Sequence, residues 1–183
     1  MARLKEYNGH YCESEYEYAF IGFLEAEGWK YSSGNNIHRV TKRDILIVDD
    51  FKKFIADTNP DLTEEEVTQI YDNVRLVGAE SDFATLHKVY GWMVNGVQFT
   101  PQDGLPRMIP LIDFDNLDKN IFRVVNQFTV EYTNNGQKEN RRPDVLLFVN
   151  GMPLCVIELK NPADANATIY DAWEQINIRY WRD

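Results

Sequence analysis

The chain has 183 residues, 44% of them hydrophobic and 13% aromatic, which predicts a folded domain with its own core and excludes a disordered segment. Its formal net charge of −10 at pH 7 excludes tight nonspecific DNA binding by the whole surface, because such binding depends on neutralised phosphates. The N-terminus has no apolar signal core and no apolar run approaches the ~20 residues that cross a bilayer, so we expect a soluble cytoplasmic protein.

The first predicted helix covers residues 14–28 and ends at Gly28. Ser14 and Glu17 have the spacing of a capping box, in which the glutamate accepts a hydrogen bond from the N-cap amide. Its apolar residues at helical spacing are Tyr16, Phe20, Phe23 and Leu24.

Residues 40–100 are predicted to form an insertion of helices and a hairpin. One helix is expected at 44–57, before the break at Asn59-Pro60, and another after Thr63, whose capping partner is Glu66. Between 89 and 99 the pattern turns strand-like around Asn95-Gly96, which is a hairpin signal. The Pro- and Gly-rich run at 100–110 is predicted to be a loop.

The core strands are predicted between residues 109 and 160. A short strand at 109–114 precedes an alternating one at 122–132, and a polar turn at 133–141 leads into two apolar runs joined at Asn150-Gly151. Both runs are apolar on both alternating faces, as in strands buried on two sides. After the break at Asn161-Pro162, a closing helix at 165–182 is expected to cover the sheet with Ile169, Trp173, Ile176 and Tyr180. The predicted fold class is α/β, with a mixed sheet flanked by helices.

The cysteines and histidines are scattered. Cys12 and Cys155 are far apart and Cys155 lies in an apolar run, so we expect a small core residue there rather than a disulfide. His10, His38 and His87 lack the close spacing of zinc ligands. Neither a disulfide framework nor a zinc site is predicted.

Three charged residues stand at the ends of the two apolar runs. Asp144 opens the first run, and Glu158 and Lys160 close the second. Charge at the rim of a core is costly unless it is paired or bound to a metal. The alternatives are a metal site and a salt bridge between Lys160 and one acid, and residue type alone favours the salt bridge.

A longer pattern favours the metal site. Pro143-Asp144 followed by Glu158-Leu159-Lys160 is similar to the PD-(D/E)xK nuclease signature. The opening SEYEYAFIGFLEAEGW, then IDFDN, NIFRVVNQFTVEY and RPDVLLFVNGMPLCVIELKNP, and a helix with Ala172 and Gln175, resemble the N-terminal nuclease domain of the restriction (R) subunit of type I restriction-modification enzymes. The resemblance covers most of the chain and is loose over residues 29–98.

The resemblance implies a restriction-endonuclease-like core, here a single nuclease domain over residues 1–183, that cuts duplex DNA. It implies modification and specificity subunits as partners, and Mg²⁺ as cofactor with Mn²⁺ as a substitute. The family's subunit also contains an ATP-driven motor, but no Walker-type lysine loop occurs in these residues. We therefore expect a piece of a larger subunit, and ATP is expected to serve the full-length subunit only.

The chemistry of the site follows from its residue types. Hydrolysis of a phosphodiester needs an activated water and stabilisation of added negative charge, which Mg²⁺ on hard oxygen ligands supplies. Asp144 and Glu158 are the expected ligands, with the Leu159 backbone carbonyl as a third candidate. Lys160 is expected to orient the water or neutralise phosphate charge. Glu17 resembles a helix glutamate that some family members add to the metal shell, and the capping box is the alternative.

DNA contacts are expected from residues around this site. Gln175 resembles the glutamine of a QxxxY helix motif that in this family touches DNA. Tyr180 follows it by five residues rather than four, so an α-helix would not place both on one face. The nearest basic cluster, a candidate for phosphate contacts or simply a solvated face, is Lys138, Arg141 and Arg142, and a second is Arg39, Lys42 and Arg43.

Strand parity constrains the turn at Asn150-Gly151. In a continuous strand Glu158 and Lys160 share a face with Val156, and Asp144 must join that face. A two-residue turn would pair Asp144 with Ile157, on the wrong face. We therefore predict a three-residue connection, 149–151, with a left-handed Gly151.

The leading interpretation is a metal-dependent endonuclease domain without sequence readout of its own, because no recognition helix is apparent. One alternative is a noncatalytic domain on the same fold that binds DNA or docks the subunit. The other is a repair-type nuclease, which would lack the IDFDN and NGMPL context.

Overall fold

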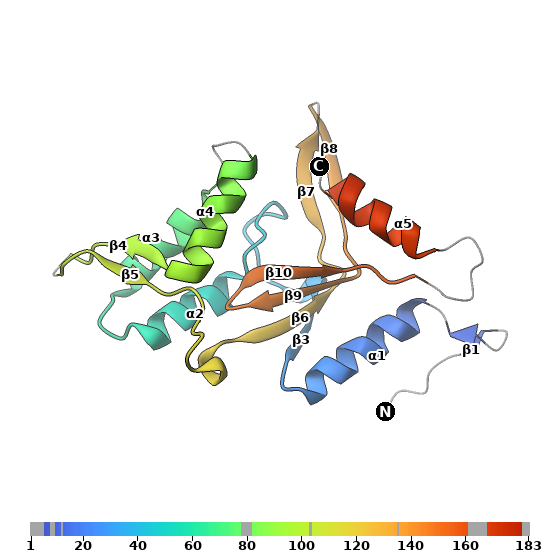
Figure 1. Cartoon of the computed structure of the whole chain (residues 1–183), viewed down its shortest axis with the longest axis horizontal. Helices are drawn as coiled ribbons and strands as arrows, with labels where there is room; N and C mark the ends of the chain where they lie inside the picture. The colour runs from blue at the N-terminus through green and yellow to red at the C-terminus, as the bar shows by residue number, and fades with distance from the viewer. Residues whose placement is uncertain are drawn as a thin grey trace. The chain divides into compact units, whose positions relative to one another are not determined.

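The structure is a computed structural model that describes residues 6–7, 10–11, 13–77, 82–102, 104–134, 136–160 and 168–180. The chain divides into two compact units (Figure 1). Unit 1 comprises Met1–Ile45, Phe122–Phe148 and Pro153–Asp183, and unit 2 comprises Leu46–Ile121 and Val149–Met152. None of the helices in the described ranges is long and apolar enough to cross a membrane.

A four-stranded sheet organises unit 1. Its strands are β3 (Lys30–Ser33), β6 (Phe122–Asn126), β9 (Val145–Val149) and β10 (Met152–Ile157), in the order β10-β9-β6-β3 (Figure 1). β3 runs parallel to β6. β6 and β9 are antiparallel, because hydrogen bonds join Gln127 to Asp144 at one end and Ile121 to Asn150 at the other. The sheet is therefore mixed, which confirms the predicted α/β class.

The two strands joined at Asn150-Gly151, β9 and β10, differ in burial. β9 is buried along most of its length, as predicted. The prediction for β10 is wrong, because Leu154 and Val156 are each 39% exposed and Cys155 is exposed rather than a core residue. β10 is an outer strand of the described sheet, and an outer strand has a neighbour on one side only.

The helix α1 (Glu13–Ala26) packs on β3 and β6, and it ends before Gly28, whose φ is +92°. The predicted helix is confirmed, but its buried face is displaced: Ile21 and Leu24 pack with Val124 and Val145, whereas Phe23 is 61% exposed. The predicted capping box is wrong, because α1 already begins at Glu13.

The strand predicted at 122–132 is interrupted. β6 ends at Asn126 because Gln127 adopts a φ of +55°, which a strand cannot continue. The chain resumes as β7 (Val130–Asn134), which forms a separate antiparallel hairpin with β8 (Gln137–Arg141). The strand predicted at 122–132 is therefore divided between two sheets, whereas its first part, β6, stays beside β9 and β10 in one sheet, as the predicted order of these strands requires.

The end of unit 1 is helical. Its residues form α5 (Ile169–Glu174), capped by Thr168 and Asp171, and the π-helical segment η3 (Gln175–Tyr180). Ile169 is 90% exposed, so this residue does not cover the sheet as predicted. The predicted break at Asn161-Pro162 lies outside the described residues. The remaining short elements of unit 1 are the antiparallel pair β1 (Glu6–Tyr7) and β2 (His10–Tyr11), and the 3₁₀ turn η1 (Gly34–Asn36).

Two helices form much of unit 2. They are α2 (Val48–Thr58) and α3 (Glu64–Arg75). The predicted capping box of α3 is confirmed: the Thr63 hydroxyl accepts the Glu66 amide N–H and the Glu66 carboxylate accepts the Thr63 amide N–H. The buried residues of these helices form one core with residues of the following strands: Phe51, Phe54, Ile55, Val67, Ile70 and Val74, with Val97, Phe99 and Ile109.

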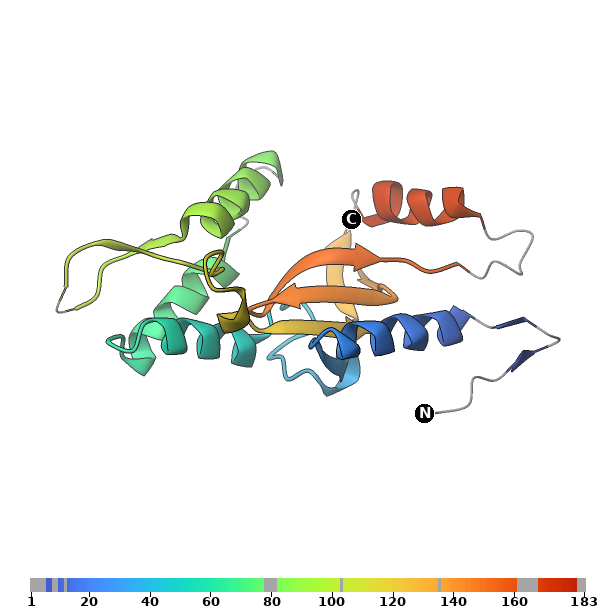
Figure 2. The ribbon, with the colours of Figure 1, turned by 60° about the horizontal axis from the view of Figure 1, so that its bottom comes forward.

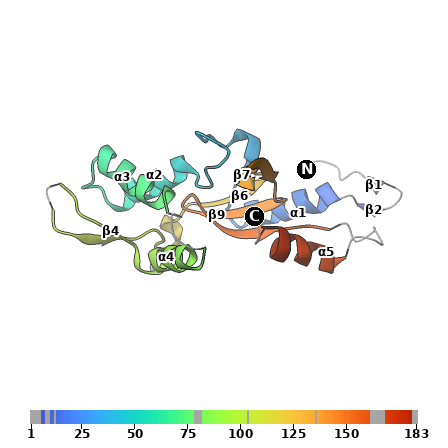
Figure 3. The ribbon, with the colours of Figure 1, turned by 90° about the horizontal axis from the view of Figure 1, so that it is seen from above.

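The hairpin predicted at 89–99 is wrong. Residues there form the helix α4 (Asp82–Asn95), followed by β4 (Val97–Phe99), which pairs with β5 (Arg107–Ile109) inside the predicted loop. Gly96 has a φ of +86°, a conformation that suits both the end of a helix and a hairpin turn, so Asn95-Gly96 alone does not distinguish them. Figures 2 and 3 show α4 on the opposite side of the β4–β5 pair from α2 and α3.

A polar network fills the loop that follows β5, which is not the strand predicted at 109–114. Asp113 accepts the amide N–H groups of Asp115 and Asn116, and these bonds hold the pKa of its carboxyl below the usual range. Asn120 bonds to Asp113 and to the side chain of the fully buried Asn150, which also donates to the Leu111 carbonyl. The IDFDN motif thus helps to hold the turn between β9 and β10.

Candidate active site

Asp144 lies just before the buried strand β9 and is itself half-buried. Its carboxylate oxygen Oδ2 accepts the backbone N–H of Leu159 at 2.8 Å. This bond places the Asp144 carboxylate beside the segment that carries Glu158 and Lys160. The beginning of one strand and the end of its hairpin partner therefore meet.

Glu158 and Lys160 share one partner. Gln175, the first residue of η3, donates from Nε2 to the Glu158 oxygen Oε2 at 2.7 Å and accepts from Lys160 Nζ at its own Oε1 at 3.1 Å. All three side chains are half-buried. An amide can make both contacts because it carries a donor and an acceptor. Gln175 thereby fixes the spacing of an acid and a base that lie two residues apart.

The turn that links the two strands is not the one predicted. Gly151 is left-handed with φ +76°, as expected, but Asn150 also has a positive φ, +51°, and β10 resumes at once at Met152. Two positive φ values in a two-residue connection are those of a type I′ turn, so the three-residue connection is wrong. The prediction assumed that the strand continues through Lys160, but β10 ends at Ile157. Glu158 and Lys160 lie beyond the strand, so strand alternation does not fix the direction of their side chains.

Glu13 is a further acid that sequence reasoning missed. Burial is the largest cause that raises the pKa of its carboxyl, and the Asp144 and Glu17 carboxylates raise it further while Lys160 lowers it. Glu13 therefore lies within electrostatic reach of the candidate site. The helical spacing of Glu13 and Glu17 was the available signal, because residues four apart on a helix lie on one face.

Glu17 is buried beside two side-chain amides. Its carboxylate accepts from Asn126 Nδ2 at 2.6 Å and from Gln127 Nε2 at 3.1 Å. Asn126 in turn accepts the Tyr31 hydroxyl. These donors compensate the burial of the charge, so Glu17 connects α1 to the end of β6. Its role as a metal ligand stays a prediction.

The two basic clusters differ in their contacts. Lys138 and Arg142 are exposed, while Arg141 lies over the Tyr132 ring at 5.2 Å and near Glu139 at 3.7 Å. In the second cluster Arg39 stacks on the Phe128 ring at 3.9 Å and donates to backbone carbonyls, and burial lowers its pKa. Arg43 and Lys42 contact Thr133 and Glu131 on β7. The second cluster therefore anchors the β7–β8 hairpin.

The backbone from Gln175 to Tyr180 is not α-helical, so the α-helical spacing used for these two residues does not apply. Residues 175–180 form a π-helix, whose hydrogen bonds join residues five apart, rather than the α-helix assumed from the sequence. The five-residue spacing of Gln175 and Tyr180 thus equals one hydrogen-bonded repeat of this segment. Single π-helical turns are frequent at functional sites.

The donor set fits a hard divalent cation. In the described part of the chain, no three His, Cys, Asp or Glu side chains gather in a way that could hold a metal. Mg²⁺ does not need three, because it keeps several waters and is bound through one or two carboxylates. Asp144 and Glu158 provide two, and an ionised carboxylate has two oxygens that accept.

A mixed sheet with helices on it makes this an α/β domain, which is consistent with a nuclease-like fold. Residues 11–183 match the family described as the type I restriction enzyme R protein N terminus, and the chain belongs to this family.

Three proteins illustrate the similarity. A putative type I restriction enzyme MjaIXP endonuclease subunit of Methanocaldococcus jannaschii is 36% identical over 86% of this chain, and the match covers 16% of that protein. The type I restriction enzyme HindI endonuclease subunit of Haemophilus influenzae is 30% identical over 89% of the chain and 16% of that protein. A putative MjaVIIIP subunit of M. jannaschii is 25% identical over 89% of the chain and 15% of that protein. The chain thus spans about a sixth of the length of these relatives.

Proposed function

We propose that unit 1 is the DNA-cutting part of a type I restriction enzyme subunit and hydrolyses phosphodiester bonds of duplex DNA with Mg²⁺. One observation carries the proposal. The Asp144 carboxylate accepts a hydrogen bond from the Leu159 backbone between Glu158 and Lys160, and the Gln175 side chain bonds to both of these residues. Membership of a family whose relatives are named endonuclease subunits supports it.

Each residue has an expected task. Asp144 and Glu158 would hold the metal, with the Leu159 carbonyl as a third oxygen, and the bound metal would activate water and offset charge on the phosphate. Lys160 supplies a positive charge without competing for the metal, and it orients the water or neutralises the phosphate. Gln175 positions Glu158 and Lys160. Lys138 and Arg142 are exposed and free to approach a phosphate backbone from β8 and the segment after it.

The raised pKa of Glu13 is consistent with a cation at this place. Several carboxylates within electrostatic reach of one another disfavour their charged forms, and a divalent cation relieves the repulsion. Such groups cluster at functional sites more often than at structural ones. Mn²⁺ would substitute for Mg²⁺ on the same oxygen donors.

The test uses the complete subunit assembled with its modification and specificity partners. Asp144→Ala, Glu158→Ala and Lys160→Ala should each reduce DNA cleavage by about 10²-fold or more, while ATP hydrolysis stays unchanged. Matched controls are Glu65→Ala and Lys53→Ala, which remove an exposed acid and an exposed lysine from unit 2. Calorimetric titration with Mn²⁺ should show binding that Asp144→Ala and Glu158→Ala abolish.

Cleavage that survives all three changes would refute the site and favour the noncatalytic alternative, in which the domain binds DNA or docks the subunit. Loss of ATP hydrolysis together with cleavage would instead show that the changes disturb assembly.

A further inference from the structure

The helix α4 in unit 2 exposes an apolar stripe. Phe83, Leu86, Tyr90 and Val94 are 80%, 56%, 64% and 51% exposed. Their spacing of three, four and four residues places them on one face of the helix. Exposed apolar surface that is contiguous rather than scattered marks an interaction site. We name these four residues the α4 stripe.

The stripe leads into a cavity of about 460 Å³, because Val94 belongs to both. The cavity lies between the ends of α2 and α4 and the IDFDN loop. Its apolar walls include Phe54, Met93, Ile112 and Phe114. A side chain with a long aliphatic stem would find apolar contacts along these walls.

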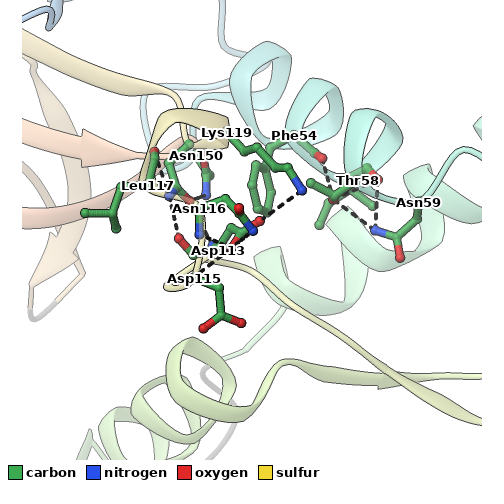
Figure 4. Close-up of polar contacts among 11 residues, drawn as sticks. Phe54, Thr58, Asn59, Asp113, Asp115, Asn116, Leu117, Lys119 and Asn150 are labelled. Atoms are coloured by element: carbon green, nitrogen blue, oxygen red, sulfur yellow. Dashed lines mark hydrogen bonds and ion pairs between the residues drawn. The ribbon is translucent and has the colours of Figure 1, made fainter.

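The polar lining of the cavity favours a positive charge. Its charged residues are Asp57, Asp113, Asp115 and Lys119. Lys119 pairs with Asp113 at 3.6 Å and Lys53 pairs with Asp57 at 2.7 Å, while the Asp115 carboxylate points away from the network of Asp113 (Figure 4). Thr58 and Asn95, the last residues of α2 and α4, also line the cavity, and helix C-termini carry partial negative charge. A Lys or Arg tip is therefore the group that this cavity suits.

The negative net charge of unit 2 favours a partner with a positively charged surface. Residues 46–121 contain fourteen Asp and Glu against six Lys and Arg, so this segment holds −8 of the net −10, and the remaining residues hold −2. A surface of this sign repels nucleic acid and anionic lipid. It also disfavours a second copy of unit 2. A basic protein surface is the macromolecule that it attracts.

We infer that unit 2 docks an amphipathic helix of a protein partner whose apolar face carries a Lys or Arg. The apolar residues of the partner helix pack along the α4 stripe. The basic side chain enters the cavity, with its stem between Phe54 and Phe114 and its charge beside Asp115. This function is separate from DNA cutting, because unit 2 contains none of the proposed catalytic residues.

The test measures binding of two labelled 18-residue peptides to the 183-residue chain by fluorescence anisotropy. Both peptides carry leucines at helical spacing, and one has lysines where the other has glutamates. The lysine peptide should bind at least about tenfold more tightly, because it can place a cation at the carboxylates. Its affinity should fall as salt is raised.

Variants locate the binding. Tyr90→Ala and Asp115→Asn should each weaken the lysine peptide by about tenfold, as loss of an interface anchor does. Phe23→Ala on α1 removes an equally exposed aromatic side chain, and Glu65→Gln removes the same charge from an exposed site on α3. Neither control should change the affinity by more than about twofold. Circular dichroism checks that each variant is folded.

Three results would overturn the inference. The first is equal affinity for the two peptides. The second is lysine-peptide binding that Phe23→Ala or Glu65→Gln weakens as much as Tyr90→Ala and Asp115→Asn do. The third is self-association of the chain in sedimentation experiments that Tyr90→Ala abolishes, which would assign the α4 stripe to a second copy.

Discussion

Units 1 and 2 use their carboxylates in opposite ways. In unit 2 the Glu66 and Asp113 carboxylates accept backbone N–H groups, and these bonds lower the pKa of both. In unit 1 burial and the nearby carboxylates of Asp144 and Glu17 raise the pKa of Glu13. A carboxylate therefore stabilises a loop where hydrogen-bond donors surround it, and it is repelled by its neighbours where other carboxylates surround it.

The side-chain amides of Asn150 in unit 2 and Gln175 in unit 1 also differ in their contacts. Asn150 in unit 2 is fully buried and its side chain contacts Leu111, Asn120 and Ile121, which is a structural role. Gln175 in unit 1 is half-buried and contacts two residues of the candidate site. Loss of the Asn150 side chain should affect folding, and loss of the Gln175 side chain should affect DNA cleavage.

The largest effect is expected for Asn150→Ala. The change removes the side-chain hydrogen bonds of Asn150 to Leu111, Asn120 and Ile121 and places alanine at a φ of +51°. The free energy of unfolding should fall by about 3 kcal/mol or more in urea titrations. Asn140→Ala, at an exposed position on β8, should change it by less than about 0.5 kcal/mol. Equal stability of the two variants would contradict the structural role of the turn.

A smaller effect is expected for Gln175→Ala. Glu158 and Lys160 keep their charges but lose the amide that bridges them. In the complete subunit, cleavage should slow by about tenfold through mispositioning, without loss of stability beyond about 1 kcal/mol. Gln137→Ala, at an exposed glutamine of β8, is the matched control. A wild-type cleavage rate in Gln175→Ala, or an equal defect in the control, would remove Gln175 from the site.

The smallest effect is a pH dependence at Glu13. Because its folded-state pKa is raised, Glu13 contributes stability that is fully present below the ordinary value of 4.5 and is lost as pH rises through the raised pKa. Glu13→Gln cannot ionise, so its unfolding free energy should exceed that of the wild type at pH 7, by less than about 1 kcal/mol after solvent screening. The difference should shrink towards pH 4. Glu15→Gln serves as control, and a difference independent of pH would contradict the repulsion.

Local patterns were readable from the sequence. The capping box of Thr63 and Glu66, the end of α1 before Gly28 and the buried strand β9 all depend on residues within a few positions of one another. The family was also readable, because a long ordered pattern of residues from 112 to 175 carries it. The signature residues Asp144, Glu158 and Lys160 belong to that pattern.

Other features were decided by neighbours that are distant in sequence. Cys155 was expected in the core, but β10 is an outer strand, and sheet order is set by long-range pairing rather than by the residues of the strand. Asn95-Gly96 suits a hairpin or a helix end, and only the pairing of β4 with β5 distinguishes them. The type I′ turn was not predicted, because the prediction of a three-residue turn required β10 to continue past Ile157, and nothing in the sequence marks the end of β10 there.

The sequence by itself determined which residues are candidates for the proposed chemistry, since side-chain type fixes what a carboxylate, an ammonium group or an amide can bind. Tertiary structure alone decided how they meet: Asp144 on the Leu159 amide, Gln175 between Glu158 and Lys160, and Glu13 near the same acids. The physical reason is range. Propensity and capping act over a few residues, whereas hydrogen bonds and electrostatic repulsion act between any groups that folding brings close.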